Sequence, residues 1–347
     1  MPVRSELHIV IPGICGPLAE TKTLEDDPAV RQWVSVLSRS TQLSSADNIN
    51  DVIASIFSMH TENDFPSAAL SLFAHGSYDP CMFYMHADPV HLQADMDSAV
   101  LSSSDDLDID DTEAVVLCDM LNQHFERDGM TFIALNKDQW YVSSSEKIRL
   151  ITTSLTEAVG RNINFILPRG ENSAHWKKLL TEAQMLMFSH ALNNKRENSG
   201  LLSINSLWFH GSGNLADVDD GDRTITGICS DRLMLKGLAR FIGCSHVEMP
   251  ASVDAYIAYL LSCQQGAKNV LYLSDLEHLV NYTDTRPWLS KLSHVLDDWF
   301  YPILKTANKN NITVTLYPCN GNSYQFSRLD YVKFWRKHTL ENHVSCY

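Results

Sequence analysis

A dozen positions of this 347-residue chain, residues 86–97, hold two histidines and three aspartates. Imidazole and carboxylate groups ligate divalent metals, but at a strand edge they also act as local hydrogen-bond partners. We favour binding of a polar ligand or a structural hydrogen-bond network over metal ligation in this segment. The residues that we expect to bind a ligand here are His91, Gln93, Asp95 and Asp97.

A second polar cluster, residues 274–278, directly follows the apolar run at residues 270–273 and contains an aspartate, a glutamate and a histidine. These residue types suit metal ligation or acid–base chemistry. The carboxyl ends of parallel strands are also where α/β sheets bind their ligands. If a metal site exists, we expect Asp275 and His278 to be its ligands.

Two glycine-containing segments are weaker candidates. Residues 12–17 form a tight turn after the first apolar run, without the lysine and the glycine spacing of a phosphate loop, so we interpret them as a structural turn. Residues 211–213, Gly-Ser-Gly, follow another apolar run and predict exposed backbone N–H groups that hold an anion. The neighbouring His210 is then either a ligand-binding residue or a hydrogen-bonded histidine at a hinge.

The composition excludes several classes of partner. The chain has 27 Lys and Arg against 42 Asp and Glu, a formal charge of −15, and no basic cluster. Nucleic acid and anionic membrane surfaces are therefore poor partners, and no apolar run reaches the length of a membrane span. The eight cysteines are scattered, so we expect free thiols in a reducing cytoplasm and no structural zinc.

The elements that must position these residues alternate between strands and helices, which predicts a parallel α/β sheet. The expected strands are at residues 7–11, 224–228, 270–273 and 312–316, and the expected helices at residues 28–37, 231–241 and 288–304. Between them we expect a helix near residues 111–125 capped by Asp111 or Thr112, paired strands at 131–135 and 140–143, and a helix capped by Ser173.

Several segments, in order along the chain, resemble motifs of the archaeal-type cofactor-independent phosphoglycerate mutases, members of the alkaline phosphatase superfamily. The segments are residues 70–80, 205–213, 228–240 and 275–278. A second set is more similar to bacterial regulatory proteins of the RpfE type: residues 88–92, 94–97, 182–185 and 205–208.

The resemblance implies an alkaline-phosphatase-like α/β core of residues 1–85 and 216–347 with an inserted α+β domain at residues 86–215. The hinges are then expected near Ala87 and Gly213. It also implies that the cleft between the two domains is the binding site.

The chain departs from this family at the residues that carry its chemistry. The family mechanism implies two metal ions, held by aspartates and histidines, that activate a Ser or Thr nucleophile. Pro12 stands where the first metal-binding aspartate is expected, and Ser67 is the hydroxyl nearest to the nucleophile position. The family has a late Asp-His metal motif that is expected after residues 312–316. There the chain offers Cys319 as its one side chain of a metal-binding type.

The substrate side departs as well, with Gln93 and His210 where arginines would recognise phosphate. Asp275 and His278 are then too few to hold two ions. We therefore expect a degenerate phosphoglycerate-mutase-like protein, a cytoplasmic pseudoenzyme without a cofactor. It would bind a small phosphorylated or acidic metabolite or act in regulation, with no nucleic-acid or membrane partner and an unspecified protein partner.

Two further functions stay open at this stage. One is a metal-dependent phosphomutase or phosphohydrolase with a rearranged site, using Mn or Zn on Asp275 and His278 and Ser67 as the nucleophile. The other, compatible with a pseudoenzyme, is ligand binding without chemistry in the inserted domain through His91, Asp95, Asp97 and His210.

Overall fold

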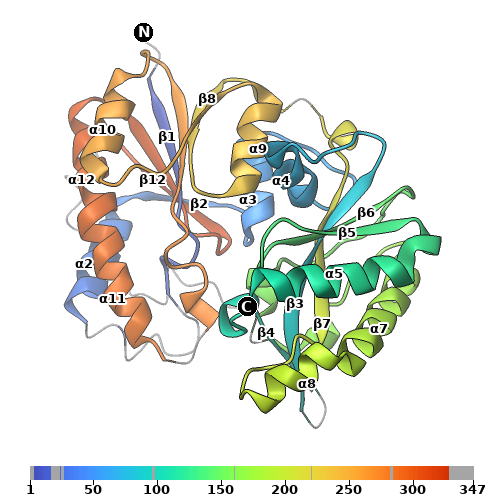
Figure 1. Cartoon of the computed structure of the whole chain (residues 1–347). Coiled ribbons are helices and arrows are strands. Elements are labelled where there is room, and N and C mark those ends of the chain that lie inside the picture. The colour runs from blue at the N-terminus through green and yellow to red at the C-terminus, as the bar shows by residue number, and fades with distance from the viewer. Residues whose placement is uncertain are drawn as a thin grey trace. The chain divides into compact units, whose positions relative to one another are not determined.

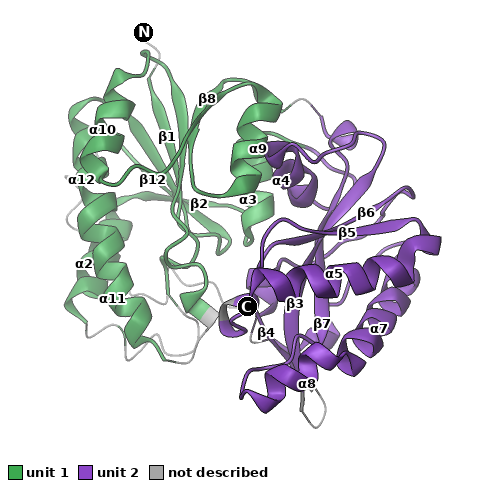
Figure 2. Cartoon of the chain, viewed as in Figure 1, with its two compact units in different colours: residues 1–59, 220–347 green, residues 60–219 purple. Residues whose placement is uncertain are grey.

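The structure is a computed structural model that describes residues 4–16, 24, 27–95, 98–159, 161–219, 221–281 and 284–327. The side chains of residues 94–99, 105 and 281 also lie outside this description. The chain divides into two compact units, residues 1–59 with 220–347 and residues 60–219 (Figure 2).

The first unit is built on a seven-stranded sheet in the order β2-β12-β11-β1-β10-β8-β9. The strands β11, β1, β10, β8 and β9 run parallel, and β12 and β2 add antiparallel strands at one edge. The predicted parallel α/β sheet is therefore confirmed. The strands are β1 (Glu6–Val10), β2 (Thr41–Ser44), β8 (Ile225–Cys229), β9 (Ser245–Val247), β10 (Lys268–Tyr272), β11 (Thr313–Tyr317) and β12 (Asn322–Phe326).

Helices cover both faces of this sheet (Figure 1). One face packs against α2, α10, α11 and α12 through a single large apolar cluster that includes Leu7 and Ile9 of β1. Figure 1 shows α3 and α9 on the opposite face. The helices are α2 (Pro28–Arg39), α3 (Ile49–Ile56), α9 (Leu233–Ile242), α10 (Val253–Ser262), α11 (Arg286–His294) and α12 (Tyr301–Lys309), with a π-helical segment, Val295–Phe300, joining the last two.

His8 lies on the central strand β1 between the fully buried Leu7 and Ile9. Its Nδ1 is 3.1 Å from the hydroxyl of Tyr317 on the neighbouring β11, and the two rings stack. Burial lowers the pKa of His8 below its usual value of 6.5, and the nearby Glu6 carboxylate only partly opposes this shift. The folded chain therefore holds a neutral imidazole next to the middle of its sheet.

Stability of the first unit is expected to fall as the pH drops below about 6.5 because of His8. Below pH 6.5 the His8 imidazole binds a proton in the unfolded chain but not in the folded chain. The contribution of His8 to the free energy of unfolding is therefore complete above pH 6.5 and is lost below it, by at most about 1.4 kcal/mol per pH unit. Between pH 7.5 and 5.5, the free energy of unfolding measured in urea should fall less for His8→Asn than for the native chain. Tyr317→Phe removes the same contact without removing the imidazole, so an equally flattened pH dependence in this variant would contradict the assignment to His8.

The second unit is built on five strands joined by antiparallel pairs, in the order β4-β3-β6-β5 with β7 paired to β3. The predicted hairpin of residues 131–135 and 140–143 is confirmed as β5 and β6. The strands are β3 (Phe83–Asp95), β4 (Ser98–Ser102), β5 (Met130–Ala134), β6 (Trp140–Ser144) and β7 (Ser206–Gly213). The helices are α4 (Ser67–His75), α5 (Asp111–Phe125), α6 (Leu155–Ala158), α7 (Ser173–Ser189) and α8 (Ala191–Asn198).

The boundaries predicted from the resemblance, 1–85 and 86–215, differ from the observed units, in which residues 60–85 belong to the second unit. The reason is strand pairing, because β3 starts at Phe83 and pairs there with β6. The expected hinge residues Ala87 and Gly213 both lie within the β3–β7 ladder. A hinge at either position would break the ladder that joins the two strands.

Two predicted helix caps are shifted by one position. The N-cap of α5 is Asp110, in a reciprocal capping box with Glu113, rather than Asp111 or Thr112. Ser173 is the first residue of α7, and Asn172 is its N-cap. The helices themselves lie where the apolar pattern predicts them.

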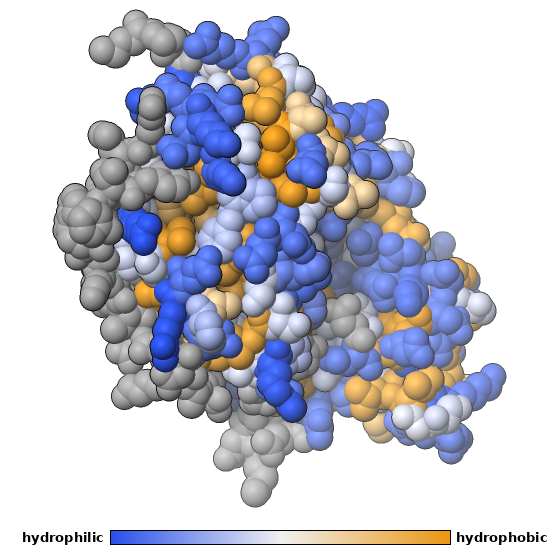
Figure 3. Space-filling model, turned by 90° about the vertical axis from the view of Figure 1, so that its left-hand side faces the viewer, coloured by the Kyte–Doolittle hydropathy of each residue, from blue (hydrophilic) through white to orange (hydrophobic). Residues whose placement is uncertain are grey.

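The surface is largely polar on the face drawn in Figure 3. Figure 3 shows a face on which hydrophilic residues predominate and hydrophobic residues form small groups between them. Among the described helices, none is both long and apolar enough to cross a membrane. The seven cysteines in the described part of the chain are free thiols, as predicted, and Cys346 lies outside it.

Candidate functional site

In the first unit, Asp275 and His278 follow β10 and line one pocket of about 470 Å³. The opposite wall comes from α11, which contributes Ser290, Lys291 and His294. Both residues therefore lie together at the carboxyl end of a central parallel strand, and their role there stays a prediction. The sequence pattern did not indicate the residues from α11.

The Asp275 carboxylate is already paired with a cation of the same chain. Its Oδ1 lies 2.6 Å from Nζ of Lys291, and the two side chains are 37% and 39% exposed. An ammonium group at this distance neutralises the negative charge that would otherwise attract a divalent ion. A metal ion at Asp275 would therefore have to compete with Lys291 for this carboxylate.

The second carboxylate of the cluster, Glu277, is buried and is also engaged. It pairs with Arg232, which precedes α9, and accepts a hydrogen bond of 2.9 Å from the Tyr272 hydroxyl. Burial, and then the Glu277 charge, raise the pKa of Tyr272 well above its usual value, so this hydroxyl stays a donor. Glu277 is thus held in a buried polar network with Arg232 and Tyr272.

The loop after β1 is a structural turn, as predicted. The indole of Trp288 donates a hydrogen bond of 2.8 Å to the carbonyl of Gly13. Gly13 has φ +80°, and a Cβ there would lie 2.6 Å from Val280 and 2.8 Å from the Leu276 carbonyl oxygen. With Pro12 before it, this loop offers no carboxylate to an ion.

A pair of divalent ions, as the family resemblance implies, does not fit this donor set. Asp275 is bound by Lys291 and Glu277 by Arg232, and among the described residues no group of three metal-binding side chains includes Asp275 or His278. A two-metal site needs a complete ligand set to fix charge and geometry. We derive no step through metal ions at this edge.

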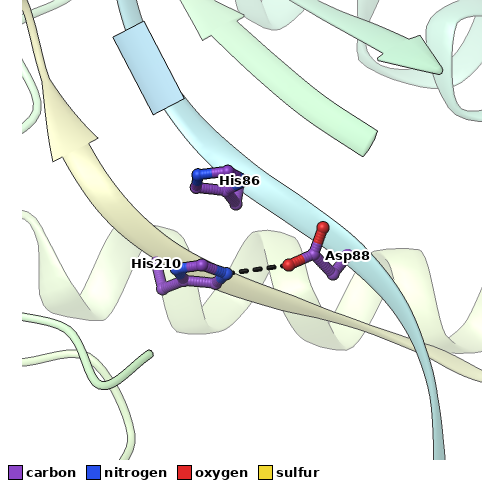
Figure 4. A group of neighbouring side chains, drawn as sticks. All are labelled: His86, Asp88 and His210. Atoms are coloured by element: carbon purple, nitrogen blue, oxygen red, sulfur yellow. Dashed lines mark hydrogen bonds and ion pairs between the residues drawn. The ribbon is translucent and has the colours of Figure 1, made fainter. Parts of the chain in front are cut away.

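The second unit contains a different cluster, formed by His86, Asp88 and His210 (Figure 4). The β3–β7 ladder places His86 directly opposite His210, and Asp88 is two residues further along β3, on the same face. The imidazoles stack with centroids 4.4 Å apart and planes at 7°. His210 Nε2 is 2.8 Å from the Asp88 carboxylate, and both of these residues are buried.

Ser67, the expected nucleophile, lies against this cluster at the start of α4. Its hydroxyl is buried and has no hydrogen-bond partner among the described residues, and the same holds for Nδ1 of His210. A Cβ on Gly211 would lie 2.0 Å from the Ser67 hydroxyl oxygen and 3.2 Å from a His86 ring carbon. Ser67 Oγ is thus at most 2.0 + 3.2 = 5.2 Å from the His86 ring.

The electrostatics of the cluster keep His86 neutral. Burial, followed by the charge of the neighbouring His210, lowers the pKa of His86 well below its usual value of 6.5. The Tyr141 ring lies 4.8 Å from the His86 ring, and burial raises the pKa of its phenol, so Tyr141 is also neutral. A neutral imidazole has a nitrogen lone pair that can accept a proton or bind a metal.

The anion site predicted at residues 211–213 is wrong, because these residues belong to β7 and their N–H groups are taken. Gly211 donates to the Thr152 hydroxyl at 3.0 Å, and Ser212 donates to the Asp64 carboxylate at 3.3 Å. Burial raises the pKa of Asp64 above its usual value despite these hydrogen bonds. The chain thus supplies its own carboxylate where a free anion was expected.

The other predicted ligand-binding residues do not join the cluster. His91 is an odd number of positions from Asp88, so it leaves β3 on the other face, where its Nδ1 is 2.8 Å from the Ser203 carbonyl. Gln93 is exposed. The Asp95 side chain and all of Asp97 lie outside the described residues.

Sequence reasoning named Ser67 as a nucleophile and His210 as a ligand-binding residue separately. It included His86 and Asp88 in the polar segment 86–97 but did not pair them with Ser67 or His210. The i, i+2 spacing of His86 and Asp88 on a strand was the available signal. No signal pointed to Lys291, because its contact joins a helix to a loop. The expected cleft between domains stays a prediction.

Comparison with known proteins gives a distant relationship. No family model matches the sequence. The 2,3-bisphosphoglycerate-independent phosphoglycerate mutase 2 of Methanothermobacter thermautotrophicus is 25% identical over 151 residues, 42% of this chain. The match spans only 37% of the length of that relative.

One solved structure supports the fold. The PH0037 protein from Pyrococcus horikoshii aligns with a TM-score of 0.50 and 11% identity over 94% of this chain and 88% of its own. The cofactor-independent phosphoglycerate mutase from Thermoplasma acidophilum aligns with a TM-score of 0.42 and 11% identity over 99% and 96%. The chain is therefore a mixed α/β protein with distant sequence similarity to a cofactor-independent phosphoglycerate mutase.

Proposed function

We propose that this chain is a non-catalytic relative of the cofactor-independent phosphoglycerate mutases that binds a small acidic or phosphorylated metabolite. In place of phosphoryl transfer, the protein would have a regulatory or binding role in a reducing cytoplasm. The observation that carries it is the Lys291–Asp275 ion pair of 2.6 Å. An internal ammonium group takes the position next to the carboxylate that a catalytic metal would need.

The same pocket offers groups that suit an anion. Lys291, His278 and Ser290 supply hydrogen-bond donors to its walls, and the pocket volume of about 470 Å³ matches that of small-molecule sites. Binding of a carboxylate or phosphate would recruit Lys291 from Asp275, so the ion pair would act as a competitor of modest strength. Weak binding is expected for this reason.

The first test is binding of 3-phosphoglycerate, with inorganic phosphate as a second probe and glycerol as the uncharged control. An anion at ten times its Kd should stabilise the chain by about 1.4 kcal/mol in thermal unfolding. Lys291→Met should remove this stabilisation, whereas Lys236→Met should keep it. Lys236 is on α9 and forms an exposed pair with Glu248, which lies after β9. Equal stabilisation of both variants would reject the pocket.

The second test separates binding from catalysis. The native chain should show no phosphoglycerate mutase or phosphatase turnover with Mn²⁺, which prefers oxygen ligands. Mn²⁺-dependent turnover that is abolished by Asp275→Asn and by Ser67→Ala would overturn the proposal. It would establish the metal-dependent phosphomutase or phosphohydrolase instead.

A further inference from the structure

We propose that His86, Asp88 and His210 bind one transition-metal ion of the zinc type within the second unit. The three side chains offer two imidazole nitrogens and a carboxylate oxygen, all within 4.8 Å of one another. This donor set, two histidines and one carboxylate, is one that zinc uses in proteins, with a further position left for water. The site is independent of the proposed function of the first unit.

The backbone holds the donors in place without help from a loop. His86 and Asp88 extend from one strand, and His210 extends from the strand paired with it. Metal–ligand bonds of about 2.0–2.2 Å place neighbouring donors about 3.3 Å apart. The widest spacing of 4.8 Å therefore has to close by about 1.5 Å when the ion binds, through rotation of the side chains.

Two unpartnered polar atoms beside the donors give a second observation. Nδ1 of His210 and the hydroxyl of Ser67 are buried without a hydrogen-bond partner among the described residues. Buried polar atoms of this kind call for an ordered water or an ion. Ser67 Oγ, within 5.2 Å of the His86 ring, is placed to hydrogen-bond a water that completes the coordination.

The buried carboxylate of the cluster also favours a cation. Asp88 is buried, and a divalent ion would offset its charge more completely than the single contact with His210.

The test is titration of the untagged full chain, freed of metal by a chelator, with Zn²⁺ in a calorimeter and with Co²⁺ by visible absorption. We expect one equivalent of Zn²⁺ and the absorption of four-coordinate Co²⁺. His86→Asn and Asp88→Asn should each weaken binding at least 10-fold. His278→Asn in the first unit and the exposed His60→Asn should bind as the native chain does.

Circular dichroism of each metal-free variant shows whether it is folded. The two cluster variants remove different donors, so the site can still be tested if one of them misfolds. Absence of Zn²⁺ binding to the folded native chain would overturn the proposal. So would binding that survives in both cluster variants or is lost in His278→Asn. None of these results depends on anion binding or turnover, so this site and the function of the first unit fail separately.

Discussion

Arg196→Met is expected to lower the free energy of unfolding by about 3–5 kcal/mol, the cost of breaking a buried ion pair from one side. The Arg196 side chain is only 2% exposed and pairs with Glu113. Its guanidinium also donates to the carbonyl oxygens of Leu107 and Leu202. Methionine fills much of the volume but leaves a carboxylate and two carbonyls without their donor.

The effect should be confined to the second unit, because all of these partners belong to it. Hydrogen exchange measured by mass spectrometry should show faster exchange in peptides from residues 60–219. Lys178→Met is the matched control, since Lys178 forms an exposed pair with Glu182 on α7 and should cost less than about 1 kcal/mol. If Arg196→Met and Lys178→Met lowered the free energy of unfolding by similar amounts, burial would not be what makes the Arg196–Glu113 pair stabilising.

The sequence was informative where burial imposes a pattern. The apolar run at β1 and the Pro28 start of α2 predicted both elements, and β10 and β11 were found in the same way. Because each of these elements buries one face in the core of the same unit, its apolar residues recur with the period of its own secondary structure. Strand order was not predictable in this way, since it depends on pairing between distant segments.

The candidate sites were less predictable because their contacts join segments far apart in the chain. Asp275 was expected as a metal ligand if a metal site exists, but its ion-pair partner Lys291 comes from the next helix. His210 was identified from the glycines beside it, yet its partner is Asp88, 122 positions earlier. Residue type and spacing indicated which side chains could bind a ligand or an ion. The pairing register of β3 and β7 determines which of them lie next to each other.

Gly211→Ala is expected to destabilise the second unit by about 2–5 kcal/mol, from two separate causes. The backbone at Gly211 has φ +63°, where a Cβ costs about 1–2 kcal/mol. The added methyl group would also overlap the Ser67 hydroxyl, 2.0 Å away, and forcing an extra group into a packed site costs about 1–3 kcal/mol. Neither strand β7 nor helix α4 can move away without losing its own contacts.

Gly76→Ala separates the two causes, because Gly76 also has a positive φ, +94°, but a Cβ there would meet nothing within 4 Å. This variant should lose only the backbone contribution, about 1–2 kcal/mol. The double variant Gly211→Ala with Ser67→Gly removes the overlapping hydroxyl and should recover part of the loss. If urea unfolding gave Gly211→Ala and Gly76→Ala the same loss, Ser67 would not pack against β7, and the hydroxyl would lose its place beside His86 and His210.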